Sequence, residues 1–197
     1  MDTASQAATR TPAPSLRRTP LHATQLADGA KLIEFAGWEL PIQYEGIRPE
    51  HLAVRAGVGV FDVSHMGQIQ LSGPQAQAAL QRLTSNDLSR LPVAGAQYGL
   101  LCNERGGVLD DLITYRIGEC DFLTVTNCAN HERDLRWIGE HVVGLDVIAD
   151  SFDFIAREVL AVEIVSGEGD GAGVVLELDD DLLNGPVRVW LQRVEPD

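Results

Sequence analysis

Short runs of hydrophobic residues, separated by glycine-rich or polar segments, recur along this chain. Runs of this length bounded by turn-forming residues are typical of β-strands. They predict strands at 32–35, 58–63 and 68–71, a pair on either side of a turn at 103–107, another at 122–126, and one that begins at 146–149. The segment 36–41 is predicted to be a loop anchored by Trp38.

Helical signals lie between these strands. Glycine commonly ends a helix, proline suits its first turn, and asparagine is a frequent N-cap. The predicted helices are one that ends at Ala27 before Gly29, one from Pro49 to Arg55, one that follows Gly73-Pro74, and one from Asn130 to Ile138. Together the elements predict an α+β fold, an antiparallel sheet with flanking helices.

The pattern is interrupted by an acidic pair. Asp110 and Asp111 stand inside the apolar run that follows the turn at 103–107. Aspartate is a poor strand former, and successive strand residues point to opposite faces, so one of the two carboxylates must face the packed side. A carboxylate held there requires partners, which makes the pair a candidate functional site.

Counting residues across the turns indicates what surrounds the pair. If 103–107 forms the first turn, Tyr98 faces Asp111 or its neighbour, because partners then sum to about 209 or 210. A second turn at 118–120 gives sums of about 237 or 238, which set Asp111 beside Thr126 or Asn127. We therefore expect Tyr98, Asp111 and Asn127 to form one polar row on the sheet.

Two alternatives stay open on these grounds. A slip of one residue sends a side chain to the other face, so Asp110 could take the place of Asp111. The simpler interpretation is that one aspartate faces solvent and the other hydrogen-bonds the next loop.

Composition limits the partners and the compartment. The chain has 197 residues, a net charge of −14 and no apolar stretch long enough to cross a membrane, so neither nucleic acid nor a membrane is expected as a partner. The three cysteines, at 102, 120 and 128, have no metal-site spacing, which argues against zinc and for a reducing compartment. We expect a cytoplasmic protein without a metal.

Both ends of the chain differ from its middle. Residues 1–18 are rich in Ala, Thr, Ser and Pro and are predicted to be a disordered tail. The tail carries three arginines but also Asp2, so a mitochondrial transit peptide is less favoured than a flexible extension. Residues 146–197 contain 13 acidic and 3 basic residues and form a divergent acidic segment, which is interpreted as a solvated face.

Five motifs between residues 19 and 141 resemble the T protein of the glycine cleavage system, a folate-binding aminomethyltransferase family. They are Thr19-Pro20-Leu21, the stretch from Phe35 to Tyr44, His51 to Arg55, Gly59 to Gly67, and the hairpin from Tyr98 to Tyr115 followed by Thr126 to Asn130. The resemblance assigns residues 19–145 to the family's folate-binding region, in its N-terminal half only.

The resemblance implies a fold and an activity. Family members bind folate in the centre of a three-domain cloverleaf, of which this chain would be an incomplete part. They move the carbon of an aminomethyl group from the lipoyl arm of the H protein to tetrahydrofolate and release ammonia. The family's key aspartate corresponds to Asp111, its tyrosine to Tyr98 and its pterin-side asparagine to Asn127, while Met66 resembles a residue near the folate.

The resemblance also has a limit. Family members are much longer, and residues 146–197 do not continue their pattern, so the later glutamate and arginines of the family correspond to no residue here. The leading hypothesis is a tetrahydrofolate-dependent aminomethyltransferase. The alternative is a truncated module that binds folate or the H protein without catalysis.

Overall fold

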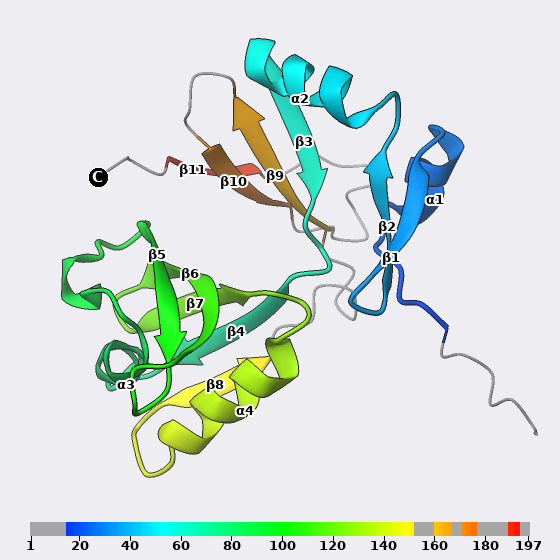
Figure 1. Cartoon of the computed structure of the whole chain (residues 1–197). Helices are drawn as coiled ribbons and strands as arrows, with labels where there is room; N and C mark the ends of the chain where they lie inside the picture. Colours follow the sequence, from blue (N-terminus) through cyan, green and yellow to red (C-terminus); the bar gives the residue numbers. More distant parts are fainter. Residues whose placement is uncertain (1–14, 152–159, 167–170, 177–188, 194–197) are drawn as a thin grey trace, which may run out of the picture.

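Three antiparallel sheets organise the protein (Figure 1). The structure is a computed structural model that describes residues 15–151, 160–166, 171–176 and 189–193. The predicted α+β class is confirmed, but the single sheet expected from the sequence is wrong. Figure 1 shows two lobes joined by the chain between two strands, β3 (Val58–Asp62) and β4 (Gly67–Ser72).

The lower lobe in Figure 1 is built on a five-stranded sheet with the order β5-β6-β7-β4-β8. Its strands besides β4 are β5 (Ala96–Cys102), β6 (Val108–Gly118), β7 (Asp121–Thr126) and β8 (Ile148–Ser151). Three of them follow one another as a meander, and β4 is inserted beside β7. The helices α3 (Ala76–Leu83) and α4 (His131–His141) pack on this sheet.

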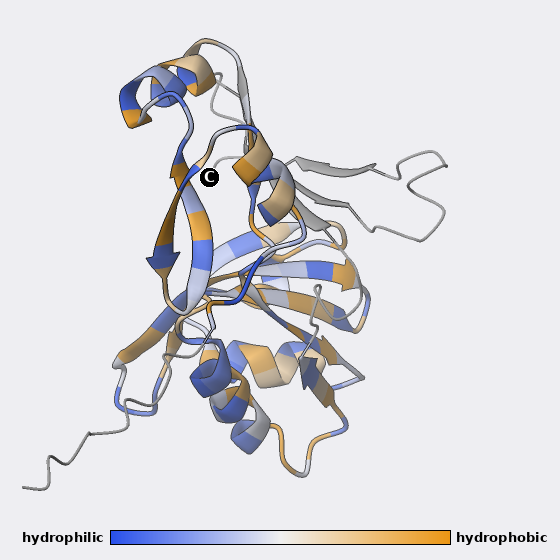
Figure 2. Ribbon diagram, turned by 90° about the vertical axis from the view of Figure 1, so that its right-hand side faces the viewer, coloured by the Kyte–Doolittle hydropathy of each residue, from blue (hydrophilic) through white to orange (hydrophobic). Residues whose placement is uncertain are grey.

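One face of this sheet forms the hydrophobic core. Along β6 and β7 every second residue is buried, as expected where one face is covered by helices and the other is open. Figure 2 shows the matching alternation of hydrophobic and hydrophilic residues along the strands. The fully buried core side chains include Ile69, Leu71, Leu80, Leu88, Leu101, Phe122 and Ile138.

The second lobe contains a hairpin where the sequence predicts a loop. β1 (Lys31–Phe35) pairs with β2 (Trp38–Gln43), so the predicted loop at 36–41 is wrong. The turn consists of Ala36 and Gly37, whose φ angles are 49° and 83°. Two successive positive φ angles make the tight turn that matches the twist of a hairpin. Ala36 gives no sequence signal for that conformation, because alanine rarely adopts it.

The remaining sheet joins distant parts of the chain. Strand β3 pairs with β9 (Leu160–Ser166), which pairs with β10 (Gly171–Leu176), which pairs with β11 (Val189–Arg193). The segment 146–197, predicted to diverge from the rest, therefore supplies strands to both larger sheets. Helices α1 (His22–Ala27) and α2 (Ile47–Ala56) complete this lobe.

Two residues of the predicted tail, Arg17 and Arg18, contact the folded part of the chain. Residues 1–14 lie outside the described part, but Arg17 and Arg18, which the sequence places in the tail, are tied to β2. Arg17 exchanges backbone hydrogen bonds with Gly37 and Glu39, each 2.9 Å long, and its guanidinium lies 4.1 Å from the centre of the Trp38 ring. A cation over a tryptophan face is attractive, so this contact adds to the two backbone bonds that hold Arg17 against β2.

The first prediction concerns Gly67, where β4 passes α4. A Cβ at this position would overlap the His131 ring and the Thr126 hydroxyl. Because a tightly packed site cannot accept a methyl group without shifts, we expect Gly67→Ala to lower the free energy of unfolding by about 1–3 kcal/mol. Urea denaturation followed by circular dichroism measures this change.

The matched control is Gly139→Ala in α4. No atom lies within 4 Å of a Cβ at this helical position. Alanine should therefore raise the free energy of unfolding by about 0.5–1 kcal/mol. Equal effects of the two substitutions would contradict the packing described for Gly67.

Candidate functional site

The two aspartates of β6 point in opposite directions. Asp110 is 5% exposed and lies on the face covered by helices, with Leu112 and Thr114. Asp111 is exposed on the open face of the sheet. The strand alternation thus produces one buried and one accessible carboxylate from adjacent residues.

Asp111 is held from two sides. The Tyr98 hydroxyl donates to Oδ2 of Asp111 at 3.1 Å, and the Asn127 amide donates to Oδ1 at 2.9 Å. The hydrogen bond to Asp111 is the main cause that raises the pKa of Tyr98, so the phenol stays protonated and remains a donor. The three residues predicted to form a row are brought together, and the Tyr98 side chain stays 58% exposed beside the carboxylate.

The register that brings them together differs from the predicted one in the first hairpin. Tyr98 lies opposite Ile113, and Leu100 lies opposite Asp111. The prediction that Tyr98 faces Asp111 or its immediate neighbour is therefore wrong. A register shift between Leu101 and Cys102 is the cause, because a bulge adds one residue to one strand. Tyr98 reaches Asp111 on the diagonal, a distance that an aromatic side chain can span.

The second hairpin follows the prediction. Leu112 pairs with Thr126, a sum of 238, and this register continues to Asp111 beside Asn127. Asn127 follows directly after the last residue of β7, where its side chain is free to turn toward β6. Its contact with Asp111 is therefore a consequence of strand pairing and strand length together.

The buried Asp110 carboxylate is surrounded by donors from the loop after β7. Its Oδ2 accepts from the backbone N–H of Asn127 at 3.1 Å. Its Oδ1 accepts from the side chains of Asn127 at 2.9 Å and Asn130 at 2.7 Å. Burial alone would raise the pKa of Asp110, but hydrogen bonds from Asp134, Asn127 and Asn130 outweigh it and lower the pKa. Asp110 is thus ionised although it is buried, and its carboxylate holds the loop after β7.

Asn127 connects the two carboxylates. Its single side-chain nitrogen donates to Oδ1 of Asp110 and to Oδ1 of Asp111, both at 2.9 Å. An NH₂ group has two protons, so it can serve both oxygens at once. The orientation of the exposed carboxylate is therefore coupled to the position of the buried one.

Asn130 does not act as the helix cap that the sequence predicts. It occupies the N-cap position of α4, but its side chain makes no capping hydrogen bond. The amide donates to Asp110 instead. This charge-assisted bond from the amide nitrogen turns the Asn130 side chain toward β6.

Asp134 is a buried acid that the sequence analysis missed. Its side chain is fully buried one helical turn after Asn130, and the Arg133 guanidinium reaches its Oδ1 at 3.2 Å. Burial and the neighbouring Asp110 raise the pKa of Asp134 to about 7. The available signal was its spacing of four residues from Ile138, which puts an acid on the apolar face of the helix.

The simpler interpretation of the acidic pair also describes part of this geometry. Asp111 is exposed to solvent, and Asp110 hydrogen-bonds the loop 127–130. The additional finding is that the exposed carboxylate is not free, since a phenol and an amide each hold one of its oxygens. Such fixed partners are more than solubility requires.

Met66 lies apart from the row of Tyr98 and Asp111. It is in the link between β3 and β4 and lines a pocket of about 100 Å³. The same pocket is lined by Trp38, His65 and Cys128, the last of which follows Asn127 in the chain. Burial lowers the pKa of His65, so its ring is neutral at pH 7. The structure therefore does not bring Met66 together with Tyr98 and Asp111.

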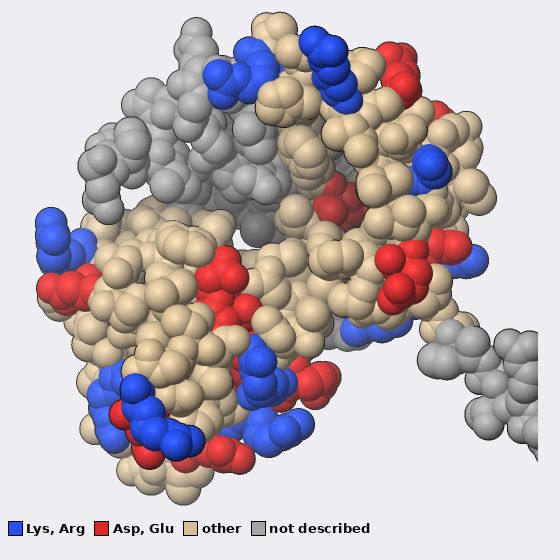
Figure 3. Space-filling view, viewed as in Figure 1, with Lys and Arg blue, Asp and Glu red and all other residues tan. Residues whose placement is uncertain are grey.

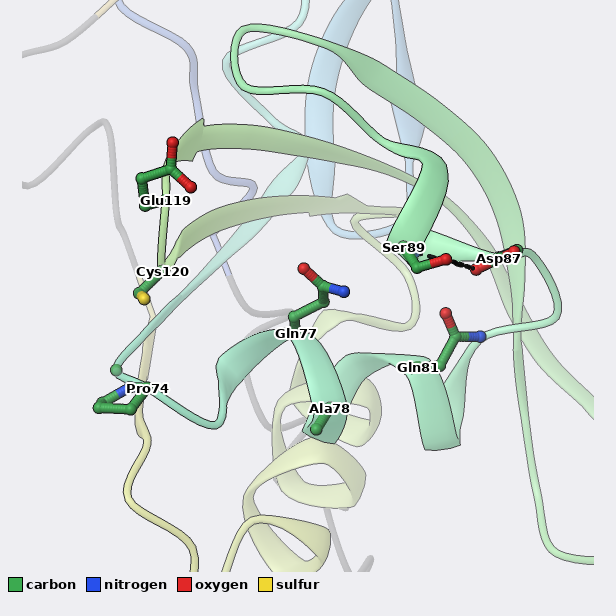
Figure 4. Close-up of a pocket in the computed structure, with 9 residues that line it drawn as sticks. Pro74, Gln77, Ala78, Gln81, Asp87, Ser89, Glu119 and Cys120 are labelled. Atoms are coloured by element: carbon green, nitrogen blue, oxygen red, sulfur yellow. Dashed lines mark hydrogen bonds between the residues drawn. The ribbon is translucent and has the colours of Figure 1, made fainter.

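A larger hollow of about 630 Å³ lies elsewhere on the lower lobe (Figure 4). It is bordered by α3, by the short 3₁₀ helix η1 (Leu88–Arg90) and by the turn between β6 and β7. Figure 4 shows Gln77 and Gln81 on α3, facing Asp87 and Ser89, which bond to each other. None of the predicted site residues lines this hollow.

Neither the distribution of charged side chains nor a group of potential metal ligands defines the site further. Figure 3 shows basic and acidic side chains interspersed over the viewed face of the lower lobe. Within the described ranges, no cluster of three His, Cys, Asp or Glu residues could hold a metal ion. No helix in that part of the chain is both long and apolar enough to span a membrane. The three cysteines are free thiols.

Comparison with solved structures identifies the class of fold. The crystal structure of glycine cleavage system aminomethyltransferase T from Bartonella henselae superposes with a TM-score of 0.71 at 34% identity. The match covers 77% of this chain and 41% of that one. The α+β arrangement around the acidic pair is therefore that of an aminomethyltransferase T protein.

Comparison of sequences identifies the family. The model of the GCVT N-terminal domain matches residues 21–163, and the chain belongs to that family. Aminomethyltransferases of Bacillus cytotoxicus and Bacillus mycoides are 45% and 44% identical over 163 residues. These matches cover 83% of this chain and 44% of each relative, so the chain spans less than half of their length. The family region extends to residue 163, whereas the sequence analysis placed its end at 145.

The second prediction follows from the raised pKa of Asp134. Between about pH 4 and 7 the folded protein keeps a proton on Asp134 that the unfolded chain has released. Stability from this group is therefore complete at low pH and is lost as the pH rises toward 7. We expect the free energy of unfolding to fall by about 2–4 kcal/mol over this range, since a tenfold change in an ionisation constant is worth about 1.4 kcal/mol.

Urea denaturation at several pH values, on the wild type and on Asp134→Asn, measures this loss. The amide does not ionise, so the variant should lack this component while it keeps the contributions of all other acids. Asp110 does not interfere, because its lowered pKa places its own contribution below about pH 4. Parallel curves for the two proteins would contradict the assignment.

Proposed function

We propose that this chain forms the tetrahydrofolate-binding part of an aminomethyltransferase of the glycine cleavage system. The reaction would move the carbon of an aminomethyl group from the lipoyl arm of the H protein to tetrahydrofolate. The observation that carries the proposal is the exposed Asp111 carboxylate, held between a phenol and an amide, in a member of the GCVT N-terminal domain family.

The chemistry of the open face suits a reduced pterin. A pterin ring carries N–H donors, and the fixed carboxylate of Asp111 is an acceptor for them. The exposed ring of Tyr98 offers a flat apolar surface beside that acceptor. A flat, hydrogen-bonding heterocycle is therefore the class of ligand that this arrangement favours.

Asp111 would position and assist the attacking nitrogen. A tetrahydrofolate nitrogen forms a bond to the methylene carbon, and the bonds from that carbon to ammonia and to the lipoyl sulfur break. A second folate nitrogen closes the product, methylenetetrahydrofolate, and the protons of the two nitrogens leave with ammonia and the thiol. A carboxylate within hydrogen-bond reach orients the nitrogen and accepts its proton in passing.

The other predicted residues would support this role. Asn127 and Tyr98 hold the Asp111 carboxylate, and Asp110 holds Asn127 from below. Met66 would contact the folate from the pocket between the lobes. The reaction needs no metal and no covalent intermediate on the protein.

The proposal also includes a partner, the H protein, and a compartment, the cytoplasm. The solved relative is named as part of the glycine cleavage system, and a lipoyl-bearing carrier would deliver the aminomethyl group. The free thiols at 102, 120 and 128 fit a reducing compartment such as the cytoplasm. A non-catalytic module that binds folate or the H protein is the alternative, and it is not favoured because the relatives are named aminomethyltransferases.

The third prediction tests the folate site. Isothermal titration calorimetry of the full chain with tetrahydrofolate should show saturable binding. Asp111→Asn should weaken it about tenfold or more, because a hydrogen bond to a charged group is worth about 1.5–3 kcal/mol. The matched control is Asp150→Asn, which changes an exposed aspartate of the same sheet on β8.

Each outcome of the titration has a consequence. Equal weakening by Asp111→Asn and Asp150→Asn would mean that the loss of affinity is not specific to Asp111, and would contradict its assignment to the folate site. No binding to the folded wild type would overturn the proposal that this chain provides a folate site. Circular dichroism of each variant establishes that the comparison is made between folded proteins.

The fourth prediction separates catalysis from binding. H protein loaded with the aminomethyl group is mixed with the chain and tetrahydrofolate, and methylenetetrahydrofolate and ammonia are measured. An aminomethyltransferase releases both, and Asp111→Asn should abolish the release while the fold persists, because one charge is lost without a change of shape. Folate binding without product would favour the non-catalytic module.

A further inference from the structure

Behind the exposed site lies a second acid, Asp134, that the proposed chemistry does not use. It is fully buried in α4, and the described residues offer no donor to its Oδ2, whereas Oδ1 is occupied by Arg133. A buried carboxyl oxygen without a donor is costly when ionised. A protonated carboxyl, by contrast, is itself a donor and needs an acceptor.

Asp110 is the acceptor that the structure provides. The two acids meet where α4 packs on β6, because Arg133 donates both to Oδ1 of Asp134 and to the carbonyl oxygen of Leu109, which precedes Asp110. Each of the two carboxyls also shifts the pKa of the other. Two adjacent carboxyls in a buried site share one proton, because both cannot be ionised at low cost. Asp110 also accepts from Asn127 and Asn130, which favours the charge on Asp110 and leaves the proton on Asp134.

The pair is linked to the open face through Asn127. The amide that donates to Asp110 also donates to Asp111, so Asn127 connects the buried pair of acids to the exposed carboxylate. The Arg133 bond to the carbonyl oxygen of Leu109 also holds α4 against β6.

We propose that Asp134 is a positioning residue, whose carboxyl shares a proton with Asp110 and so keeps the Asn127 amide in place against Asp111. The inference rests on the proposed function only because it takes Asp111 as the residue that binds folate. Loss of the shared proton puts two negative charges side by side, pushes Asp110 from Asn127, and loosens the Asp111 carboxylate.

Few other charges act on Asp134. The charged groups that shift its pKa are Asp110 on β6 and Arg133 on α4 itself. The helix α4 also packs against β4, β8 and α3, whose charged residues are Asp150 and Arg82. Neither of these shifts the pKa of Asp134. The pair should therefore titrate as a local unit near pH 7.

The test follows the Asn127 side-chain amide by ¹⁵N nuclear magnetic resonance of the free full-length chain between about pH 5 and 9. In the wild type its resonance should move with a midpoint near pH 7. In Asp134→Asn, whose amide donates without ionising, the resonance should stay at the low-pH position throughout. Asp150→Asn, the matched control on β8, should keep the wild-type midpoint.

Two results would overturn the inference. One is a wild-type Asn127 resonance that does not move between about pH 5 and 9, and the other is the same midpoint in Asp134→Asn. Because no folate is present, neither result depends on the proposed function. A failure of folate binding in the calorimetric experiment would in turn leave this measurement unaffected.

A second readout connects the pair to the ligand. Between pH 7 and 8 the wild type should lose affinity for tetrahydrofolate, by up to the roughly tenfold loss expected for Asp111→Asn. Asp134→Asn should bind equally at both values and match the wild type at low pH. A merely structural role for Asp134 would lower affinity in the variant without removing its pH dependence, and that outcome would also contradict the proposal.

Discussion

The open face of the sheet depends on the buried Asp110 carboxylate and on its hydrogen bonds with the loop after β7. This carboxylate accepts hydrogen bonds from the backbone and side chain of Asn127 and from the side chain of Asn130. These bonds compensate for the removal of a charge from water, which would otherwise oppose folding. They also fix the start of α4 against β6, so the helix that covers the core and Asn127, one of the two residues that hold Asp111, are placed by the same carboxylate.

This arrangement separates two tasks between adjacent residues. Asp110 faces the packed side and organises the loop, while Asp111 faces outward and remains accessible. A strand is suited to this division because its alternation puts neighbours on opposite faces without any special backbone. Asn127 couples the positions of Asp110 and Asp111, because its single side-chain amide donates to both carboxylates.

The chain is a member of the GCVT N-terminal domain family, and its candidate site lies on an exposed sheet face. Two pockets of the described residues, of about 630 and 100 Å³, are lined by other side chains, and the row of Tyr98 and Asp111 lines neither. A ligand at this face would be recognised by fixed polar groups and one aromatic ring. That mode of recognition depends on preorganisation, which the network beneath the sheet supplies.

The sequence by itself determined the α+β class, most of the strands, the second hairpin register and the grouping of Tyr98, Asp111 and Asn127. These follow from local periodicity and short turns, in which partners lie close along the chain. Only the tertiary structure decided the division into three sheets, the bulge that moved Tyr98 opposite Ile113, and the role of Asn130. Asp134 also escaped prediction, because it meets Asp110 only when α4 docks on the sheet, and contacts between distant segments leave no periodic trace in a single sequence.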